Sequence, residues 1–147
     1  MNQNPYNDRG GFLMNVFLHG KNIQDECISN IVSLGDFVFV SGQTGQGQTI
    51  EQQARTACEK LDGQLSLMHL EMRHIVKTTI YLKHLEDREV FLQVYKQFFE
   101  APYPACTIIG VDHLQEDALV QIEAFALNTL RYEKSMKDSH CSDCGGC

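Results

Sequence analysis

The helical pattern that begins at Thr49 constrains the fold more than any other feature of this sequence. Thr49 and Gln52 have the spacing of a capping box, in which the hydroxyl accepts from the third backbone N–H of the helix and the glutamine reaches back. Apolar residues then recur at helical spacing in one stripe, namely Ile50, Ala54, Ala57, Cys58, Leu61, Leu65 and Met68. Gly63 interrupts the helix and is expected to face solvent or a closely packed strand. This amphipathic helix needs another layer of structure to cover its apolar side.

The segments around this helix have the character of strands. Residues 31–32 and 37–41 are strand-like and meet at the turn dipeptide Gly35-Asp36. The run 37–40 (FVFV) is continuously apolar, which predicts a strand that is buried on both faces. Residues 75–82 are rich in β-branched side chains, and residues 107–111 and 119–127 predict two more strands. A second amphipathic helix begins near Asp87 and ends before Pro102.

The order of these elements predicts an α+β fold, in which a mixed β-sheet carries two helices packed on one face. The other face of the sheet then needs cover, so we expect an oligomer. The length of 147 residues suits one domain. We expect a flexible lead-in over residues 1–14, a folded domain over 15–130 and a flexible, cysteine-rich tail over 131–147.

The composition argues against several classes of protein. A net charge of -7 disfavours nucleic acid as a main partner, because phosphate binding needs clustered lysine and arginine. No apolar run approaches the roughly 20 residues that cross a bilayer, and the N-terminus lacks the pattern of a signal peptide. We therefore predict a cytoplasmic protein without a membrane segment, whose six cysteines are reduced or bind metal. The glycine-rich loop 42–48 lacks the Lys-Ser/Thr ending of a phosphate loop, so it is interpreted as a flexible connection.

Five segments resemble the Rid family (reactive intermediate deaminases, also called YjgF-like proteins), in order and at the family's spacing. They are residues 39–43 (FVSGQ), 75–82 (IVKTTIYL), 94–99 (VYKQFF), 102–105 (PYPA) and 120–124 (VQIEA), within about residues 28–128. The resemblance implies a chorismate-mutase-like fold and a homotrimer with clefts between its subunits. It also implies hydrolysis of reactive enamines and imines, such as 2-aminoacrylate, to keto acids and ammonia, without a metal or organic cofactor.

The sequence departs from the family at two positions that carry its chemistry. The family's arginine after Pro-Ala, which holds the substrate carboxylate, is replaced by Cys106, and cysteine cannot form a bidentate pair with a carboxylate. The family's glutamate on the last strand, which positions or activates water, is replaced by Gln121, and an amide cannot act as a general base. Glu123 matches a second family glutamate on the same strand face. We therefore expect a divergent member, lacking the substrate-binding arginine, whose substrate differs from 2-aminoacrylate.

The candidate site combines these positions with two serines. We predict catalytic roles for Cys106, Gln121 and Glu123, and substrate binding by Ser29, Ser41 and Cys106. Cys106 either lines the site as an inert thiol or acts as a nucleophile where its thiolate is stabilised. The expected ligand is a small-molecule metabolite held in a cleft between subunits.

The C-terminal tail contains a separate motif. Cys141, Cys144 and Cys147 have tight metal-ligand spacing, and His140 could be a fourth ligand. Zinc sites usually draw ligands from two parts of a chain, so these cysteines are weak candidates, and we predict no metal in the folded domain. A flexible thiol-rich tail and a redox sensor are the alternatives.

Three functions remain open at this point. The first is a trimeric deaminase of the Rid type, and the second is a non-catalytic trimer that binds a small metabolite or has a regulatory role. The replacement of both the arginine and the glutamate favours the second, and imine hydrolysis separates the two. Ribonuclease activity is a third possibility, which the net charge disfavours.

Overall fold

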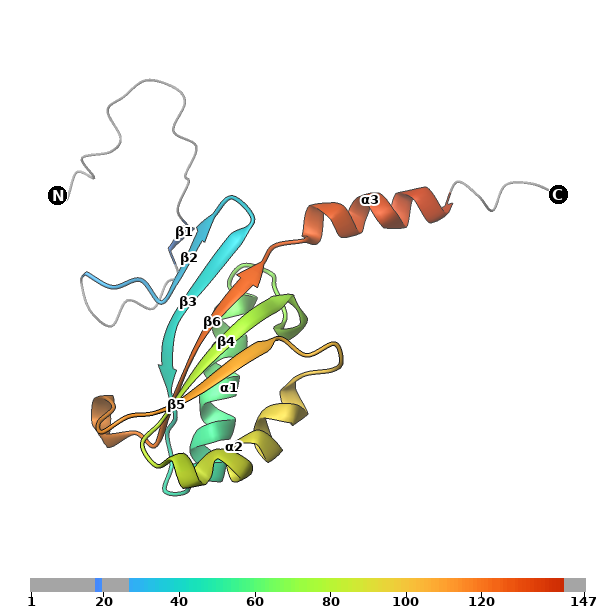
Figure 1. Cartoon of the computed structure of the whole chain (residues 1–147). Coiled ribbons are helices and arrows are strands. Elements are labelled where there is room, and N and C mark those ends of the chain that lie inside the picture. The colour runs from blue at the N-terminus through green and yellow to red at the C-terminus, as the bar shows by residue number, and fades with distance from the viewer. Residues whose placement is uncertain (1–17, 20–26, 142–147) are drawn as a thin grey trace.

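The computed structural model of the chain describes residues 18–19 and 27–141, of which 18–19 and 138–141 are described by their backbone alone (Figure 1). The lead-in predicted over residues 1–14 lies outside these ranges. The strands are β1 (Leu18–His19), β2 (Ile31–Leu34), β3 (Phe37–Thr44), β4 (Ile75–Leu82), β5 (Ala105–Gly110) and β6 (Val120–Leu127). The helices are α1 (Ile50–Ser66), α2 (Arg88–Tyr95) and α3 (Leu130–Cys141), with short 3-10 helices η1 (Met72–His74), η2 (Leu85–Asp87), η3 (Lys96–Phe98) and η4 (Gln115–Asp117).

The strands form one mixed sheet in the order β1-β2-β3-β6-β4-β5. Strands β4 and β5 are parallel, and the other neighbours are antiparallel. Helix α1 lies against β3 and β6, and α2 packs beside α1 on the same side of the sheet (Figure 1). The prediction of a mixed sheet with two helices on one face is therefore confirmed. None of the helices in the described ranges is long and apolar enough to cross a membrane.

Helix α1 begins where its capping residues predict. Thr49 Oγ1 accepts a hydrogen bond from the Gln52 N–H at 3.2 Å. Gln52 reaches back to the N–H of Gln48, at 2.8 Å, one residue earlier than a standard capping box requires. Gly63 faces open space, as expected. The predicted stripe is buried against the sheet at Ala54, Ala57, Cys58, Leu61 and Leu65.

The prediction that β3 is buried on both faces is wrong for the described chain. Val38 and Val40 point into the core, whereas Phe37 and Phe39 are 49% and 43% exposed. On this open face the Phe125 ring of β6 contacts both phenylalanines, with ring centroids 5.8 and 4.8 Å apart. The helices cover one face of the sheet only, so a single chain leaves an aromatic surface in contact with solvent.

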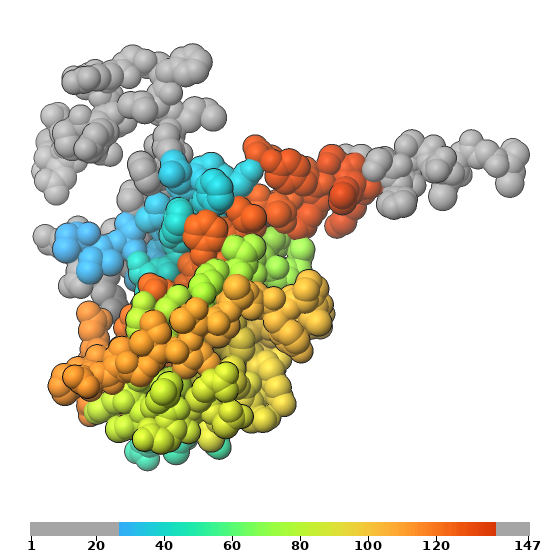
Figure 2. Space-filling model, viewed as in Figure 1, coloured from blue at the N-terminus to red at the C-terminus, as the bar shows by residue number. Residues whose placement is uncertain are grey.

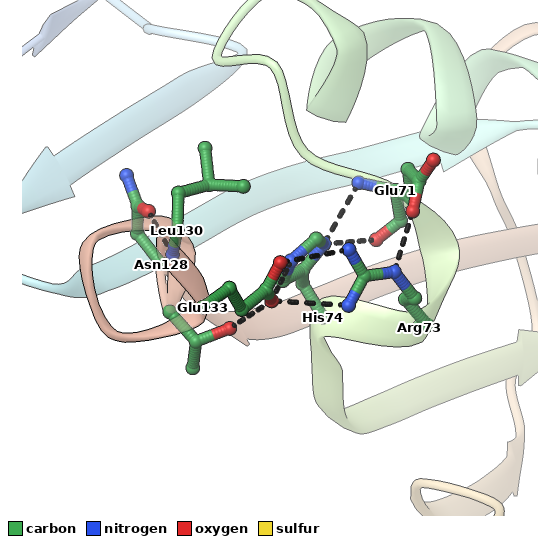
Figure 3. A network of polar contacts seen from close by, with 7 residues as sticks. Glu71, Arg73, His74, Asn128, Leu130 and Glu133 are labelled. Carbon is green, nitrogen blue, oxygen red and sulfur yellow. Dashed lines mark hydrogen bonds and ion pairs between the residues drawn. The ribbon is translucent and has the colours of Figure 1, made fainter. Parts of the chain in front are cut away.

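Helix α3 occupies the first part of the tail (131–147), whose flexibility stays a prediction. Helix α3 extends away from the sheet (Figure 1). Its first turn is attached to the domain through Glu133, whose two carboxylate oxygens accept from two guanidinium nitrogens of Arg73 at 3.0 Å each (Figure 3). Thr129 also donates to Glu133, at 2.7 Å. The hydrogen bonds from Arg73, and secondarily from Thr129, lower the pKa of Glu133 to about 2.

A buried histidine completes this attachment. His74 Nδ1 accepts the backbone N–H of Glu71 at 3.0 Å, so the neutral ring carries its proton on Nε2. That Nε2 lies 3.1 Å from Glu133 and donates to it (Figure 3). Helix α3 is thus connected to η1, a segment far away in the sequence.

Candidate functional site

The site begins at an irregularity in β3. Between Val40 and Gln43 the pairing with β6 shifts by one residue, which marks a β-bulge at Ser41 and Gly42. Bulges bend a strand and redirect its side chains, and they are frequent beside functional sites. Here the bulge lies next to the start of β6, where Gln121 projects from the open face of the sheet.

Gly42 allows Gln121 to lie directly against the bulge. A Cβ atom on residue 42 would be 2.5 Å from Cδ and 2.9 Å from Cγ of Gln121, and nearer still to its Nε2. Ordinary Cβ contacts begin at about 3.4 Å. The absence of a side chain at Gly42 therefore determines where the Gln121 amide lies.

Ser41 connects the bulge to the segment that precedes β2. Its hydroxyl donates to the carbonyl oxygen of Ser29 at 2.7 Å, and its N–H donates to the carbonyl oxygen of Asn30 at 2.8 Å. Gln43 Nε2 donates to the carbonyl oxygen of Ser41 at 2.8 Å. The two serines predicted to bind substrate thus lie together, and the proton of Ser41 is committed to the main chain.

A third element comes from the loop between β5 and β6. At its start the N–H of Val111 donates to the Leu82 carbonyl oxygen at 2.9 Å. At its end the N–H of Leu119 donates to Oε1 of Gln53, a buried residue of α1, at 2.7 Å. Between these points, Lys83 forms a hydrogen-bonded ion pair with Asp117, which lowers the pKa of that carboxyl group. The loop is therefore attached at its first residue and over its last three residues.

These three elements border a partly open cavity of about 310 Å³. Its lining consists of Ile28, Asn30, Ser41, Gly42, His113, Leu114, Gln115 and Gln121. The lining combines amide groups, which both donate and accept hydrogen bonds, with two aliphatic side chains. Among the residues that the structure describes, this lining contains no carboxylate, lysine or arginine. Such a cavity can hold a small, polar, uncharged molecule and orient a water molecule beside it.

The structure divides the predicted site residues into two groups. Ser41 and Gln121 line the cavity, and Ser29 lies behind it. Glu123 is outside the lining, although it is on the same strand face as Gln121, and it accepts a hydrogen bond from the Tyr81 hydroxyl at 2.6 Å. This hydrogen bond raises the pKa of Tyr81.

Cys106 is separated from these residues within one chain. It pairs with Thr78 in the parallel β4–β5 ladder, so its side chain shares the helix-covered side of the sheet with the buried Thr78. Cys106 is nevertheless exposed, because β5 is the edge strand and lies at the surface (orange in Figure 2). Thr78 Oγ1 and the hydroxyl of Tyr95 are 2.8 Å apart, and burial raises the pKa of Tyr95. A reactive role for Cys106 stays a prediction.

Sequence reasoning missed several residues of the cavity. Asn30, His113 and Gln115 come from two loops, and no local pattern indicates that these loops meet. A glycine inside a strand pattern is the usual signal of a bulge or a close backbone approach, and Gly42 carried that signal. Gly42 is therefore a residue of the cavity that a local sequence pattern could have indicated.

The tail cysteines contribute nothing to this site. Cys141 is the last residue of α3, and Cys144 and Cys147 lie outside the described residues. Within the part of the chain that the structure describes, no three histidine, cysteine or acidic side chains are grouped as metal ligands would be. Cys58 is buried in the core, where burial raises the pKa of its thiol to about 12.

Comparison with known proteins identifies the family. Residues 27–128 match the family model described as endoribonuclease L-PSP. The chain belongs to this family. Its relatives include proteins named as reactive intermediate deaminases, so the resemblance to the Rid family is confirmed.

Two relatives of this L-PSP family chain have informative names. TdcF of Escherichia coli (strain K12), provisionally named a reactive intermediate deaminase, is 33% identical over 108 residues, which cover 67% of this chain and 84% of TdcF. A 2-iminobutanoate/2-iminopropanoate deaminase of Dermatophagoides farinae is 28% identical over 107 residues, with the same coverage of 67% and 84%. The crystal structure of E. coli TdcF with bound serine matches with a TM-score of 0.66 and 31% identity, over 68% of this chain and 87% of that one.

Proposed function

We propose that this protein is a homotrimeric deaminase that hydrolyses a small enamine or imine to a carbonyl compound and ammonia. The cavity between the β3 bulge, residues 28–30 and residues 113–115 is its proposed binding site. The observation that carries the proposal is the position of Gln121, which lies at the wall of this cavity in the space that Gly42 leaves free, in a chain whose relatives are named deaminases. Hydrolysis of an imine needs a positioned water molecule, and an amide can hold one through both its oxygen and its nitrogen.

The charge of the lining narrows the substrate class. The relative from D. farinae is named for imino acids, which carry a carboxylate next to the imine carbon. None of the described residues that line the cavity is an arginine or lysine, so a substrate carboxylate would find no cationic partner among them. We therefore propose a substrate without a carboxylate at that position.

The proposed trimer rests on the open face of the sheet. Phe37, Phe39 and Phe125 form an aromatic cluster there, with Val76 and Ile109 exposed on neighbouring strands. Exposed apolar surface of this kind marks an interface in soluble proteins, and closed symmetric assemblies are the usual way to bury it. A trimer would also bring the edge strand β5, with Cys106, close to a neighbouring subunit.

Ammonia release from two matched sets of imines tests this function. An amino-acid oxidase generates imines with a carboxylate, and an amine oxidase generates imines without one. We expect the purified protein, shown to be a trimer by sedimentation equilibrium, to accelerate hydrolysis of the second set above the rate in buffer. Gln121→Ala should reduce this acceleration, while Gly63→Ala, which changes a solvent-facing position of α1, should leave it unchanged. A folded trimer that accelerates neither set contradicts the proposal.

The second candidate is a non-catalytic or regulatory trimer that binds a metabolite in the same cavity. The replacement of the family's arginine and glutamate by Cys106 and Gln121 favours it. Saturable binding of a neutral carbonyl compound, measured by calorimetry in a protein without turnover, would support this candidate. Cleavage of RNA is a poorer fit, because the cavity lining has no cation for a phosphate and the chain carries a net charge of -7.

A further inference from the structure

One side chain in the lining of the cavity can move a proton near neutral pH. Asn30, Gln115 and Gln121 are amides, which hold water but do not take its proton. Ser41 already donates its proton to the carbonyl of Ser29. Among the described residues of the lining, His113 is the remaining polar side chain, and histidine is the residue that most readily gains and loses a proton between pH 5 and 8.

The loop that carries the exposed His113 is held at both of its ends. Besides its attachments at Val111 and Leu119, the N–H of Ala118 donates to the carbonyl of Gln115 at 3.1 Å, which closes the η4 turn. Within this turn Glu116 and Asp117 both adopt left-handed backbone conformations, with φ angles of 56° and 54°. Such conformations cost free energy in non-glycine residues and persist where the surroundings hold them. A proton-transfer group needs this kind of support to stay at a productive distance.

We propose that His113 is the catalytic acid and base of the deaminase reaction, an assignment that rests on the proposed function. In the first stage the oxygen of a water molecule forms a bond to the imine carbon. The proton that this water loses passes to the imidazole of His113 and from there to the imine nitrogen, which gives a carbinolamine.

In the second stage the carbinolamine hydroxyl loses its proton to the same imidazole. The carbon–nitrogen bond breaks as the carbonyl forms, and the departing nitrogen takes that proton and leaves as ammonia. Each stage moves one proton from oxygen to nitrogen, so His113 ends in the state in which it began. The reaction consumes the imine and one water molecule and needs no other reactant. Gln121, across the cavity, would orient the water during the first stage.

A test of His113 needs a control histidine in similar electrostatic surroundings. The pKa of the Asp117 carboxyl group is lowered mainly by Lys83. The nearby His113 and His84 also contribute to this lowering. The charged and titratable side chains around this loop are Lys83, His84, Asp112, Glu116 and Asp117. His84 is exposed and lies outside the cavity lining. His84→Gln therefore removes a histidine near the same carboxylate without changing the cavity.

The experiment compares the wild-type protein, His113→Gln and the control His84→Gln in the ammonia-release assay. General acid–base catalysis contributes roughly 10²- to 10⁴-fold, so we expect kcat of His113→Gln to fall by about a hundredfold or more with little change in KM. The dependence of kcat/KM on pH between 5 and 8 should disappear in this variant and persist in His84→Gln. Added imidazole should restore part of the activity of His113→Ala, which a merely structural role would not allow.

Two results would overturn the assignment, and only the second of them would also overturn the proposed function. If the wild type hydrolyses imines and His113→Gln matches His84→Gln in kcat and pH profile, His113 has no role in proton transfer and the proposed function stands. If the folded wild-type trimer hydrolyses no imine, both the assignment and the proposed function fail.

Discussion

Replacing Gly42 by alanine tests whether the position of Gln121 decides what the cavity does. The added methyl group would lie 2.5 and 2.9 Å from two side-chain carbons of Gln121, where ordinary contact begins at about 3.4 Å. The main chain of the bulge is held by the hydrogen bonds of Ser41 to residues 29 and 30, whereas the half-buried Gln121 side chain has room to rotate. We therefore expect Gln121 to change rotamer and leave the wall of the cavity.

The structure gives different magnitudes for stability and for activity. An extra methyl group in a rigid core costs about 1–3 kcal/mol, and here the cost should lie near the lower end because the neighbour is a flexible side chain. The loss of a hydrogen bond that holds water or substrate costs about 1–3 kcal/mol. In the transition state this corresponds to a fall of roughly 5- to 150-fold in kcat/KM. In free energy, the cost to activity should therefore equal or exceed the cost to folding.

The assay is a double-mutant cycle with Gln121→Ala. The free energy of unfolding, from urea denaturation, and kcat/KM for imine hydrolysis are measured for Gly42→Ala, Gln121→Ala and the double variant. The destabilisation by Gly42→Ala should vanish when residue 121 is alanine, because the overlapping atoms are absent. Gly63→Ala, in the solvent-facing part of α1, should stabilise the protein by about 0.5–1 kcal/mol without changing activity.

The reasoning would be refuted by additive stability effects in this cycle together with wild-type activity of Gly42→Ala. That result would mean that Gln121 does not depend on Gly42 for its position, or that its position does not matter to the reaction.

Three further predictions concern the rest of the fold. Thr78→Val should lower the free energy of unfolding in urea by about 1–3 kcal/mol, because the buried Tyr95 hydroxyl loses its hydrogen-bond partner at 2.8 Å. An unchanged free energy of unfolding would contradict a stabilising role for this hydrogen bond. Glu133→Gln should speed hydrogen exchange of the α3 amides at neutral pH. In the wild type the lowered pKa of Glu133 means that the attachment of α3 by this carboxylate is fully present above about pH 4.5 and is lost as the pH falls towards about 2. Protection of the α3 amides that does not change over this pH range would contradict this role of Glu133. Phe39→Asp should convert the proposed trimer to monomers in sedimentation equilibrium, whereas Leu67→Asp, at an equally exposed position (43%) after α1, should not.

Local patterns in the sequence determined most of the secondary structure. The strand predicted at Ile75–Leu82 has the same bounds in the structure, and α1 follows directly after Thr49. Both predictions depend on interactions within a few residues, namely β-branched side-chain preference and an N-terminal cap. The order of these elements was also sufficient to predict a mixed sheet covered by helices on one side.

The errors occurred where distant segments decide the outcome. The apolar run 37–40 does not reveal that only one face of β3 is covered, because that depends on which side the helices pack. The polar sequence of α3 gives little sign of a helix, and its first turn is attached by Arg73 and His74, which lie some 60 positions earlier in the chain.

The candidate site likewise contains residues that the sequence predicted and residues that only the structure revealed. The sequence predicted site roles for Ser41 and Gln121, whose positions match a family pattern along the strands, and both residues line the cavity. Only the tertiary structure excluded Glu123 from the lining and placed Cys106 on the opposite side of the sheet. It also added His113, because the loop after β5 reaches the β3 bulge only when β6 pairs between β3 and β4. Strand order is a property of long-range pairing, which no local stretch of sequence encodes by itself.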